Sequence, residues 1–225
     1  IEGWIMRSIE HAIFKYEELD ERAKEKAREW CASNVFNYSH DWEHTLDDAV
    51  CVGAIIGIEI DTIRGSRRTP AIYFSGFWSQ GDGACFEATY RYAKEAAKKI
   101  REYAPHDEEL HRITDALQDI QRRNFYKLIA RCKQSGHYCH SGCMSVEVEH
   151  DDDRYRDIGD AEDDIKQALR DFANWIYQQL EAEYEYQTSE EVVAESIIAN
   201  EYEFNEDGSQ QLLPRWFDIH TQLQV

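Results

Sequence analysis

The sequence has few basic residues for its length. It contains 25 Lys and Arg against 45 Asp and Glu, which gives the 225-residue chain a formal net charge of −20. A protein that binds nucleic acid by itself presents a basic surface to the phosphates, so direct nucleic-acid binding is disfavoured, although not excluded. Aromatic residues make up 12% of the chain, with six Trp, and this content excludes an acidic disordered tail.

The chain also lacks a long hydrophobic run, since a membrane span needs roughly 18 apolar residues. Its longest apolar stretch, residues 49–58, has the length of a buried helix. We expect no membrane association, no signal peptide, and a natural start at Met6, with residues 1–5 as additions ahead of it. Six cysteines without an export signal predict reduced thiols and a cytoplasmic protein.

No catalytic signature is present. Residues 74–83 hold several glycines, but a nucleophile elbow would need Gly at position 77, which is Phe. They are not a phosphate-binding or dinucleotide-binding loop either, because the glycine spacing differs and no Lys follows. We therefore predict no catalytic residues and no cofactor, and we favour a protein that is not an enzyme.

The acidity is concentrated in one part of the chain. Residues 145–207 contain 21 acidic and four basic residues, whereas residues 91–134 contain seven acidic and 11 basic residues. Such an asymmetry indicates a defined acidic surface rather than a uniform coat, with a weakly basic segment before it.

The hydrophobic patterns predict an α+β fold, with an antiparallel sheet of about four strands in two hairpins packed against several amphipathic helices. We expect a single domain over residues 6–208, whose acidic helical part is 145–207, and a C-terminal arm or strand over 209–225. The predicted helices are 17–34, 41–56, 91–103, 107–121, 160–185 and 189–200. The predicted strands are 71–77 and 84–90, joined by a glycine turn, and 125–133 and 146–149.

The predicted helix 160–185 carries acidic side chains opposite its apolar face. Carboxylates fixed on a helix can occupy the groove of a basic protein in place of nucleic-acid phosphates. The alternative is a solvated face that only keeps the protein soluble, and the two readings are evenly balanced. The candidate partner-binding residues are Asp163, Asp164, Asp171, Glu181 and Glu185.

Two further motifs are candidate sites. Trp78, Ser79, Gln80 and Asp82 lie in the glycine turn, where glycines permit close backbone approach to a ligand. A tight hairpin turn with its aromatics in the core is the favoured alternative. The second motif is a cluster of histidines and cysteines, His137, Cys139, His140 and Cys143. It is a weak candidate for a zinc site, because zinc sites normally combine two clusters of this kind. The favoured interpretation is a polar hairpin tip with incidental Cys and His.

Three strings resemble a family of uncharacterised phage and prophage proteins. They are IYFSGFWSQGDGACFE at residues 72–87, ELDERAKEKAREW at 18–30 and EVVAES at 191–196. The first string is specific to that family, and the likeness covers most of the chain from Tyr16 to Gly208. Members are sometimes loosely labelled as antitoxins. The resemblance implies a phage or mobile-element origin and the host cytoplasm, and it implies no catalytic residues.

Three functions remain open. The first is a phage-derived inhibitor that binds a basic protein or nucleoprotein complex of the host defence, such as a CRISPR effector or a restriction enzyme. The second is an antitoxin that neutralises one cognate toxin. The third is an enzyme or small-ligand binder that uses the Ser79–Gly83 loop. Self-association into a homodimer is also left open.

Overall fold

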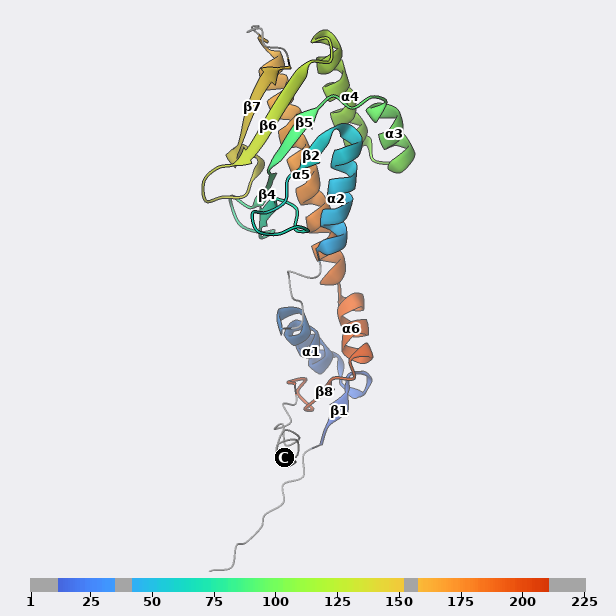
Figure 1. Ribbon diagram of the computed structural model, residues 1–225. Helices are drawn as coiled ribbons and strands as arrows, with labels where there is room; N and C mark the ends of the chain where they lie inside the picture. Colours follow the sequence, from blue (N-terminus) through green and yellow to red (C-terminus); the bar gives the residue numbers. More distant parts are fainter. Residues whose placement is uncertain (1–11, 35–41, 152–157, 211–225) are drawn as a thin grey trace, which may run out of the picture. The chain divides into compact units, whose positions relative to one another are not determined.

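The computed structural model describes residues 12–34, 42–151 and 158–210, and the chain divides into two compact units (Figure 1). Unit 1 comprises residues 1–38 and 185–225, and unit 2 comprises residues 39–184. Residues 1–5 and nearly all of the predicted arm 209–225 lie outside the described residues. The prediction that residues 6–208 form one cooperative domain stays a prediction.

Unit 2 is built on a four-stranded antiparallel sheet with the strand order β2-β5-β6-β7. Its register places Ala130 opposite both Tyr90 and Val148, and these side chains face the core. The neighbouring Arg131 lies opposite Thr89 and is exposed, so the sheet has one apolar face and one charged face. The four strands are β2 (Ile58–Ile60), β5 (Ala88–Arg91), β6 (Leu128–Gln134) and β7 (Met144–His150).

A second, two-stranded sheet is formed by β3 (Ile72–Ser75) and β4 (Gly83–Phe86). The predicted α+β class, the four-stranded antiparallel sheet and both hairpins are confirmed. The predicted strand 84–90 is, however, two strands separated by Glu87, and its second half joins the larger sheet. The fourth strand of that sheet, β2, has only three residues and was not predicted.

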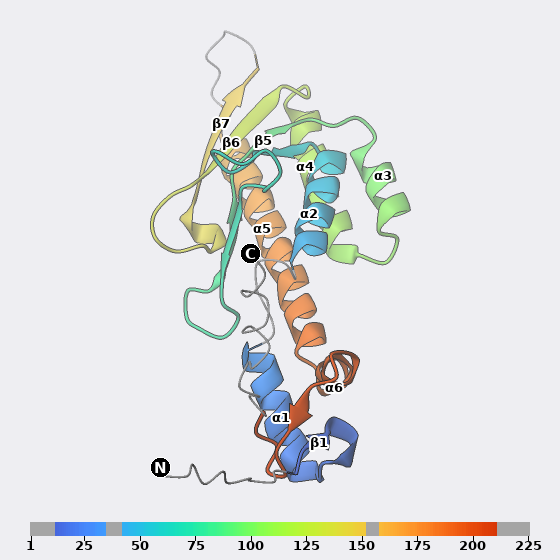
Figure 2. The same ribbon diagram turned by 60° about the horizontal axis from the view of Figure 1, so that its bottom comes forward.

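Four helices of unit 2 pack against the apolar face of the sheet or against one another (Figures 1 and 2). The predicted apolar face of α5 is confirmed, since Ile165, Leu169, Phe172, Ile176 and Leu180 are all buried. The predicted helix start at Arg91 is wrong, because that residue belongs to β5. The helices are α2 (Glu43–Ile56), α3 (Ala96–Tyr103), α4 (Glu108–Arg123) and α5 (Ala161–Gln187).

Gly57 makes the direct passage from α2 into β2 possible. It ends the helix with φ of 92°, a left-handed conformation that favours glycine. A Cβ at this position would lie 2.1 Å from the carbonyl oxygen of Arg91, so a side chain is also excluded by space. The turn therefore sets β2 beside β5 and buries Ile58 directly after the helix.

Unit 1 has its own small core. Phe14 in β1 pairs with Phe204 in β8, and the edge of the Trp30 ring packs on Phe204 with ring centroids 6.0 Å apart. Ser189 caps α6, where its side chain accepts a hydrogen bond from the backbone of Val192. The elements are β1 (Phe14–Lys15), a 3-10 turn (Tyr16–Glu18), α1 (Glu21–Asn34), α6 (Glu190–Ala199) and β8 (Glu203–Phe204).

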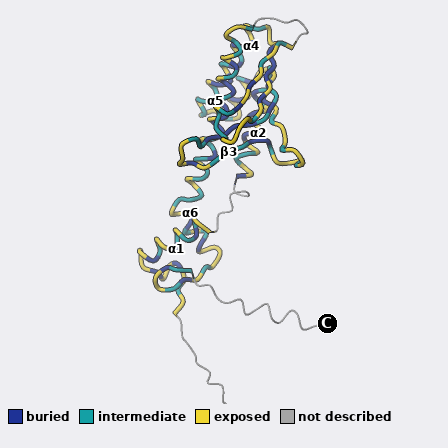
Figure 3. The backbone as a smooth tube through the Cα atoms, turned by 90° about the vertical axis from the view of Figure 1, so that its left-hand side faces the viewer, coloured by how far each residue is buried: buried dark blue, intermediate teal, exposed yellow. Residues whose placement is uncertain are grey.

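Burial along the backbone follows these elements (Figure 3). In unit 2 it is concentrated on the strands and on one side of α5, and in unit 1 on the facing sides of α1 and α6. Within the described ranges, no helix has both the length and the apolar composition of a membrane span.

Candidate functional site

The predicted acidic face of α5 is not a row of equivalent carboxylates. Asp171 has a side chain only 15% exposed, and it accepts hydrogen bonds from Arg112 at 2.7 Å and from Gln167 at 2.7 Å. Asp164 forms an ion pair with Arg123 at 3.3 Å. Both arginines belong to α4, so these two carboxylates fasten α5 to its neighbouring helix.

The other three residues of that face are placed differently. Asp163 is exposed over 91% of its side chain and lies at the 4.0 Å limit of an ion pair with Lys166. Glu181 is half-buried, and Glu185 is exposed on the last turn of α5, in unit 1. The basic segment 91–134 thus neutralises part of the acidic segment within unit 2.

Arg112 is the centre of this network. It also contacts Glu109 at 2.6 Å, and the resulting hydrogen bonds hold the pKa of Glu109 below its usual value. The same partners raise the pKa of Arg112, led by Glu109 and followed by Asp171. Charged groups with such short contacts serve as internal connections between helices and are poor candidates for binding a partner.

Exposed acidic side chains are concentrated in unit 1 instead, where Glu21, Glu190 and Asp207 form ion pairs with basic residues of α1. Its described residues, 12–34 and 185–210, contain 14 acidic and five basic residues, and all 14 acidic residues are exposed. On α1, Glu21, Glu25 and Glu29 recur every fourth residue, and Glu191 and Glu195 do so on α6. Residues at this spacing lie on one side of a helix, about 6 Å apart along the axis.

A hollow of about 660 Å³ opens beside α1 within unit 1. Five carboxylates line it against two basic side chains, Arg22 and Lys26. Lys26 is paired with Asp207 at 2.6 Å, and this contact, with those of Ser209, holds the pKa of Asp207 far below its usual range. The acidic lining consists of Asp20, Glu25, Glu29, Glu206 and Asp207.

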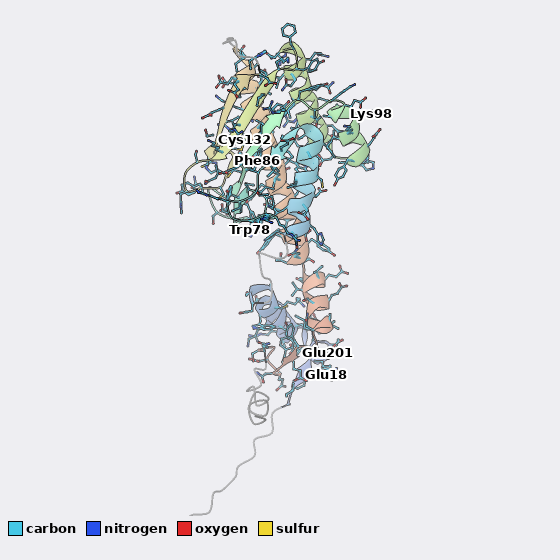
Figure 4. The ribbon with its side chains drawn as sticks, viewed as in Figure 1. Glu18, Trp78, Phe86, Lys98, Cys132 and Glu201 are labelled. Atoms are coloured by element: carbon cyan, nitrogen blue, oxygen red, sulfur yellow. The ribbon has the colours of Figure 1, made fainter. Side chains whose placement is uncertain are left out.

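The glycine turn presents one large aromatic side chain to solvent. Figure 4 labels this residue, Trp78, which is 72% exposed. The following Ser79 and Gln80 are also exposed. Asp82 has a structural role, since its carboxylate accepts hydrogen bonds from the backbone of Ser79 at 2.6 Å and of Trp78 at 3.1 Å. Phe77 points inward and stacks on Tyr184, so the turn is anchored on α5.

The four residues of the weak zinc candidate do not converge. The His140 ring is hydrogen-bonded to Gly142 and to Cys143, while the edge of the His137 ring packs on Tyr138. In the ranges that the structure describes, no group of three or more His, Cys, Asp or Glu side chains is arranged to hold a metal ion.

Sequence reasoning included the part of this acidic surface that lies in residues 185–207, but it missed the part on α1. The fourfold spacing of Glu21, Glu25 and Glu29 is visible in the sequence, but the intervening Lys and Arg lower the net charge of that segment. The pairing of Asp164 and Asp171 with arginines 41 and 59 residues away carries no local signal.

Comparison with known proteins gives one result. No curated protein and no solved structure matches the chain. A family model described as "Domain of unknown function (DUF8835)" matches residues 42–190, which is more than half of the chain and covers nearly all of unit 2. The chain therefore belongs to the DUF8835 family, and most of unit 1 lies outside the matched region.

Proposed function

We propose that this protein is an acidic inhibitor that binds a basic, nucleic-acid-handling surface of a host defence complex, in the manner of an anti-CRISPR or anti-restriction protein. The observation that supports this most directly is the exposure of all 14 acidic residues described in unit 1, against only five basic residues. Ordinary surfaces mix the two signs more closely. The resemblance of residues 72–87 to phage proteins supports the setting of host defence.

The arrangement of these charges supports the same proposal. Glu25 and Glu29 on α1, like Glu191 and Glu195 on α6, are like charges one helical turn apart, which costs about 0.2–0.5 kcal/mol per pair. Rows of carboxylates on helices present fixed negative charge, as a nucleic-acid backbone does. A cationic partner would relieve the repulsion and would be drawn to the surface by its potential.

The binding surface includes only part of the face predicted on α5. Asp164 and Asp171 are already paired with Arg123 and Arg112, so a partner would have to compete with these ion pairs. Glu185 is exposed and extends the acidic surface of unit 1. We therefore assign the partner-binding role chiefly to the carboxylates of unit 1.

Affinity capture of the full chain from a bacterial host lysate tests the proposal. The bait is compared with a variant in which Glu25, Glu29, Glu191 and Glu195 are changed to Lys. The wild type should retain a basic nucleic-acid-binding protein at 50 mM NaCl and lose it at 500 mM, because salt screens exposed charges. The variant should fail to retain this partner protein at both salt concentrations. Added double-stranded DNA should displace the partner protein from the wild type.

A matched control reverses the same number of charges in unit 2. This control variant changes four exposed acidic residues to Lys: Glu43, Asp47, Glu147 and Glu149. It should capture the partner as the wild type does. A partner that survives 500 mM salt, or that the unit 1 variant still captures, would contradict the proposal. Capture of a single basic toxin, in place of a defence complex, would identify the antitoxin alternative.

A second candidate function rests on Trp78. An exposed Trp on a turn closed by Asp82 is a suitable platform for a planar ligand or for an apolar side chain of a partner. Trp78→Ala should then abolish binding of that ligand without altering capture by unit 1. Fluorescence of the wild type and of this variant, titrated with nucleotides and nucleosides, tests it. An identical response of both proteins would exclude this role.

A further inference from the structure

Two motifs that are separate in the sequence meet in unit 2. The last glycine of the glycine turn, Gly83, lies against His140 of the loop between β6 and β7. A Cβ at Gly83 would be 2.7 Å from the Cβ of His140, so only glycine allows the histidine to sit there. The string at residues 72–87 therefore contains a residue, Gly83, that makes room for a histidine 57 residues further along the chain.

His140 in turn contacts a cysteine. Its Nε2 lies 3.3 Å from the Sγ of Cys143, and both residues are partly exposed. The backbone N–H of Gly142 donates a hydrogen bond to Nδ1 at 3.1 Å. Because Nδ1 is an acceptor, the proton of the neutral ring is on Nε2, and this N–H is directed at the sulfur. Such a donor stabilises the thiolate, the nucleophilic form of cysteine.

The backbone of Cys143 is held at both of its polar groups. Its N–H donates to the carbonyl oxygen of His140 at 2.9 Å, which closes the 3-10 turn Ser141–Cys143. Its carbonyl oxygen accepts from the N–H of Ser135 at 3.1 Å and from the Ser135 hydroxyl at 2.8 Å. The loop thus holds the backbone that carries the sulfur and the imidazole.

The other thiols have different surroundings. Burial raises the pKa of Cys85 and of Cys132 to about 12, and it also raises the pKa values of Cys31 and Cys139. Burial disfavours the nucleophilic thiolate form of all four. Cys51 is exposed on α2 and serves as an internal reference for an accessible thiol.

We propose that Cys143 is a thiol modification site at which His140 positions and stabilises the thiolate for exchange with a low-molecular-weight disulfide. Ionisation releases the thiol proton to solvent. The thiolate attacks one sulfur of the disulfide, a new S–S bond forms on Cys143, and the disulfide's own S–S bond breaks. The departing thiolate takes a proton from solvent, so no further oxidant is required. On its other side, His140 stacks on Tyr138, whose side chain is 60% exposed.

The experiment uses the full chain and glutathione disulfide at pH 7.4, followed by intact mass and peptide mapping. Cys143 should form the mixed disulfide about tenfold faster than Cys51, because the attacking species is the thiolate. His140→Ala should lower the rate at Cys143 to that of Cys51. His137→Ala, a histidine of the same loop, should leave it unchanged, and near-native circular dichroism of each variant verifies folding.

Gly83→Ala provides a second, indirect variant. It displaces His140 without removing any reactive group, so the rate at Cys143 should fall while the rate at Cys51 stays the same. Equal rates at Cys143 and Cys51 in the wild type would overturn the proposal. So would a rate at Cys143 that is unaffected by His140→Ala. Both outcomes are independent of partner binding by unit 1.

Discussion

Two buried thiols link the stability of unit 2 to pH. Cys85 and Cys132 are fully buried, and burial raises the pKa of each to about 12, against 9.0 for a free thiol. A folded-state pKa above the unfolded value gives stability that is complete below about pH 9 and is lost as pH rises towards 12. Above pH 9, each thiol should lower the free energy of unfolding by about 1.4 kcal/mol per pH unit.

Urea denaturation at pH 8, 9 and 10, followed by circular dichroism, measures this slope. Cys132→Ala should reduce the dependence on pH above 9, even though the cavity it creates lowers stability at every pH. An unchanged slope in this variant would show that other groups cause the alkaline loss.

Asp171 and Asp163 should respond differently to the same substitution. Asp171→Asn removes a carboxylate that is mostly buried and bonded to Arg112, so we expect a loss of about 1–2 kcal/mol. Asp163→Asn changes a side chain that is 91% exposed, so we expect less than about 0.5 kcal/mol. Chemical denaturation at pH 7 measures both. Equal effects would mean that the network around Arg112 does not stabilise the fold.

At the residue scale, helical periodicity identified the correct side of α5. It predicts which residues face away from the core, because 100° of rotation per residue is a local property. It does not distinguish a free carboxylate such as Asp163 from a paired one such as Asp171. That difference depends on Arg112, which the fold brings close from another helix.

Among the elements, the connection from α4 to β6 depends on one buried amide. The side chain of Gln121 donates to the carbonyl oxygen of Leu128 at 2.8 Å and accepts from its N–H at 3.2 Å. Phe125 and Tyr126 lie in the turn between Gln121 and Leu128. Their φ values are 56° and 60°, an uncommon backbone conformation for residues with large side chains. The paired amide stabilises this turn by fixing the first residue of β6.

Gln121→Ala should therefore destabilise unit 2 by about 2–4 kcal/mol, because it leaves two buried backbone groups without partners. Gln118→Ala, on the same helix, should change stability by less than about 0.5 kcal/mol. Denaturation midpoints of both variants provide the measurement. If Gln121→Ala lowers stability as little as Gln118→Ala does, water must satisfy the N–H and the carbonyl oxygen of Leu128 in the variant.

Sequence patterns predicted the long elements and missed the short junctions. α5 and β6 have enough residues for a periodicity to be recognised. The break at Glu87 was not predicted, because it arises from long-range pairing. The N–H of Glu87 donates to Ala71, and its carbonyl oxygen accepts from Asp61. These partners turn a continuous apolar run into two strands of different sheets.

For the whole molecule, the two units should differ in local stability. The core of unit 1 contains eight buried apolar residues, far fewer than that of unit 2, and a small core stabilises a fold only marginally. We expect amides of α1 and α6 to exchange with deuterium faster than those of β6. Hydrogen exchange of the full chain at pH 7 measures this. Uniform exchange would instead support the single cooperative domain predicted over residues 6–208.

Salt should affect the two units in opposite directions. The 14 exposed acidic residues of unit 1 repel one another, so screening by about 0.5 M NaCl should slow exchange in α1 and α6. In unit 2, the pairs of Arg112 and Arg123 with Asp171 and Asp164 weaken in the same salt.

Changing both Glu25 and Glu29 to Gln should reproduce the effect of salt on α1 at low ionic strength, because it removes a like-charge pair. Exchange that is independent of salt would contradict this account. A stabilised variant that has also lost its partner would show that the repulsion on α1 is retained for binding.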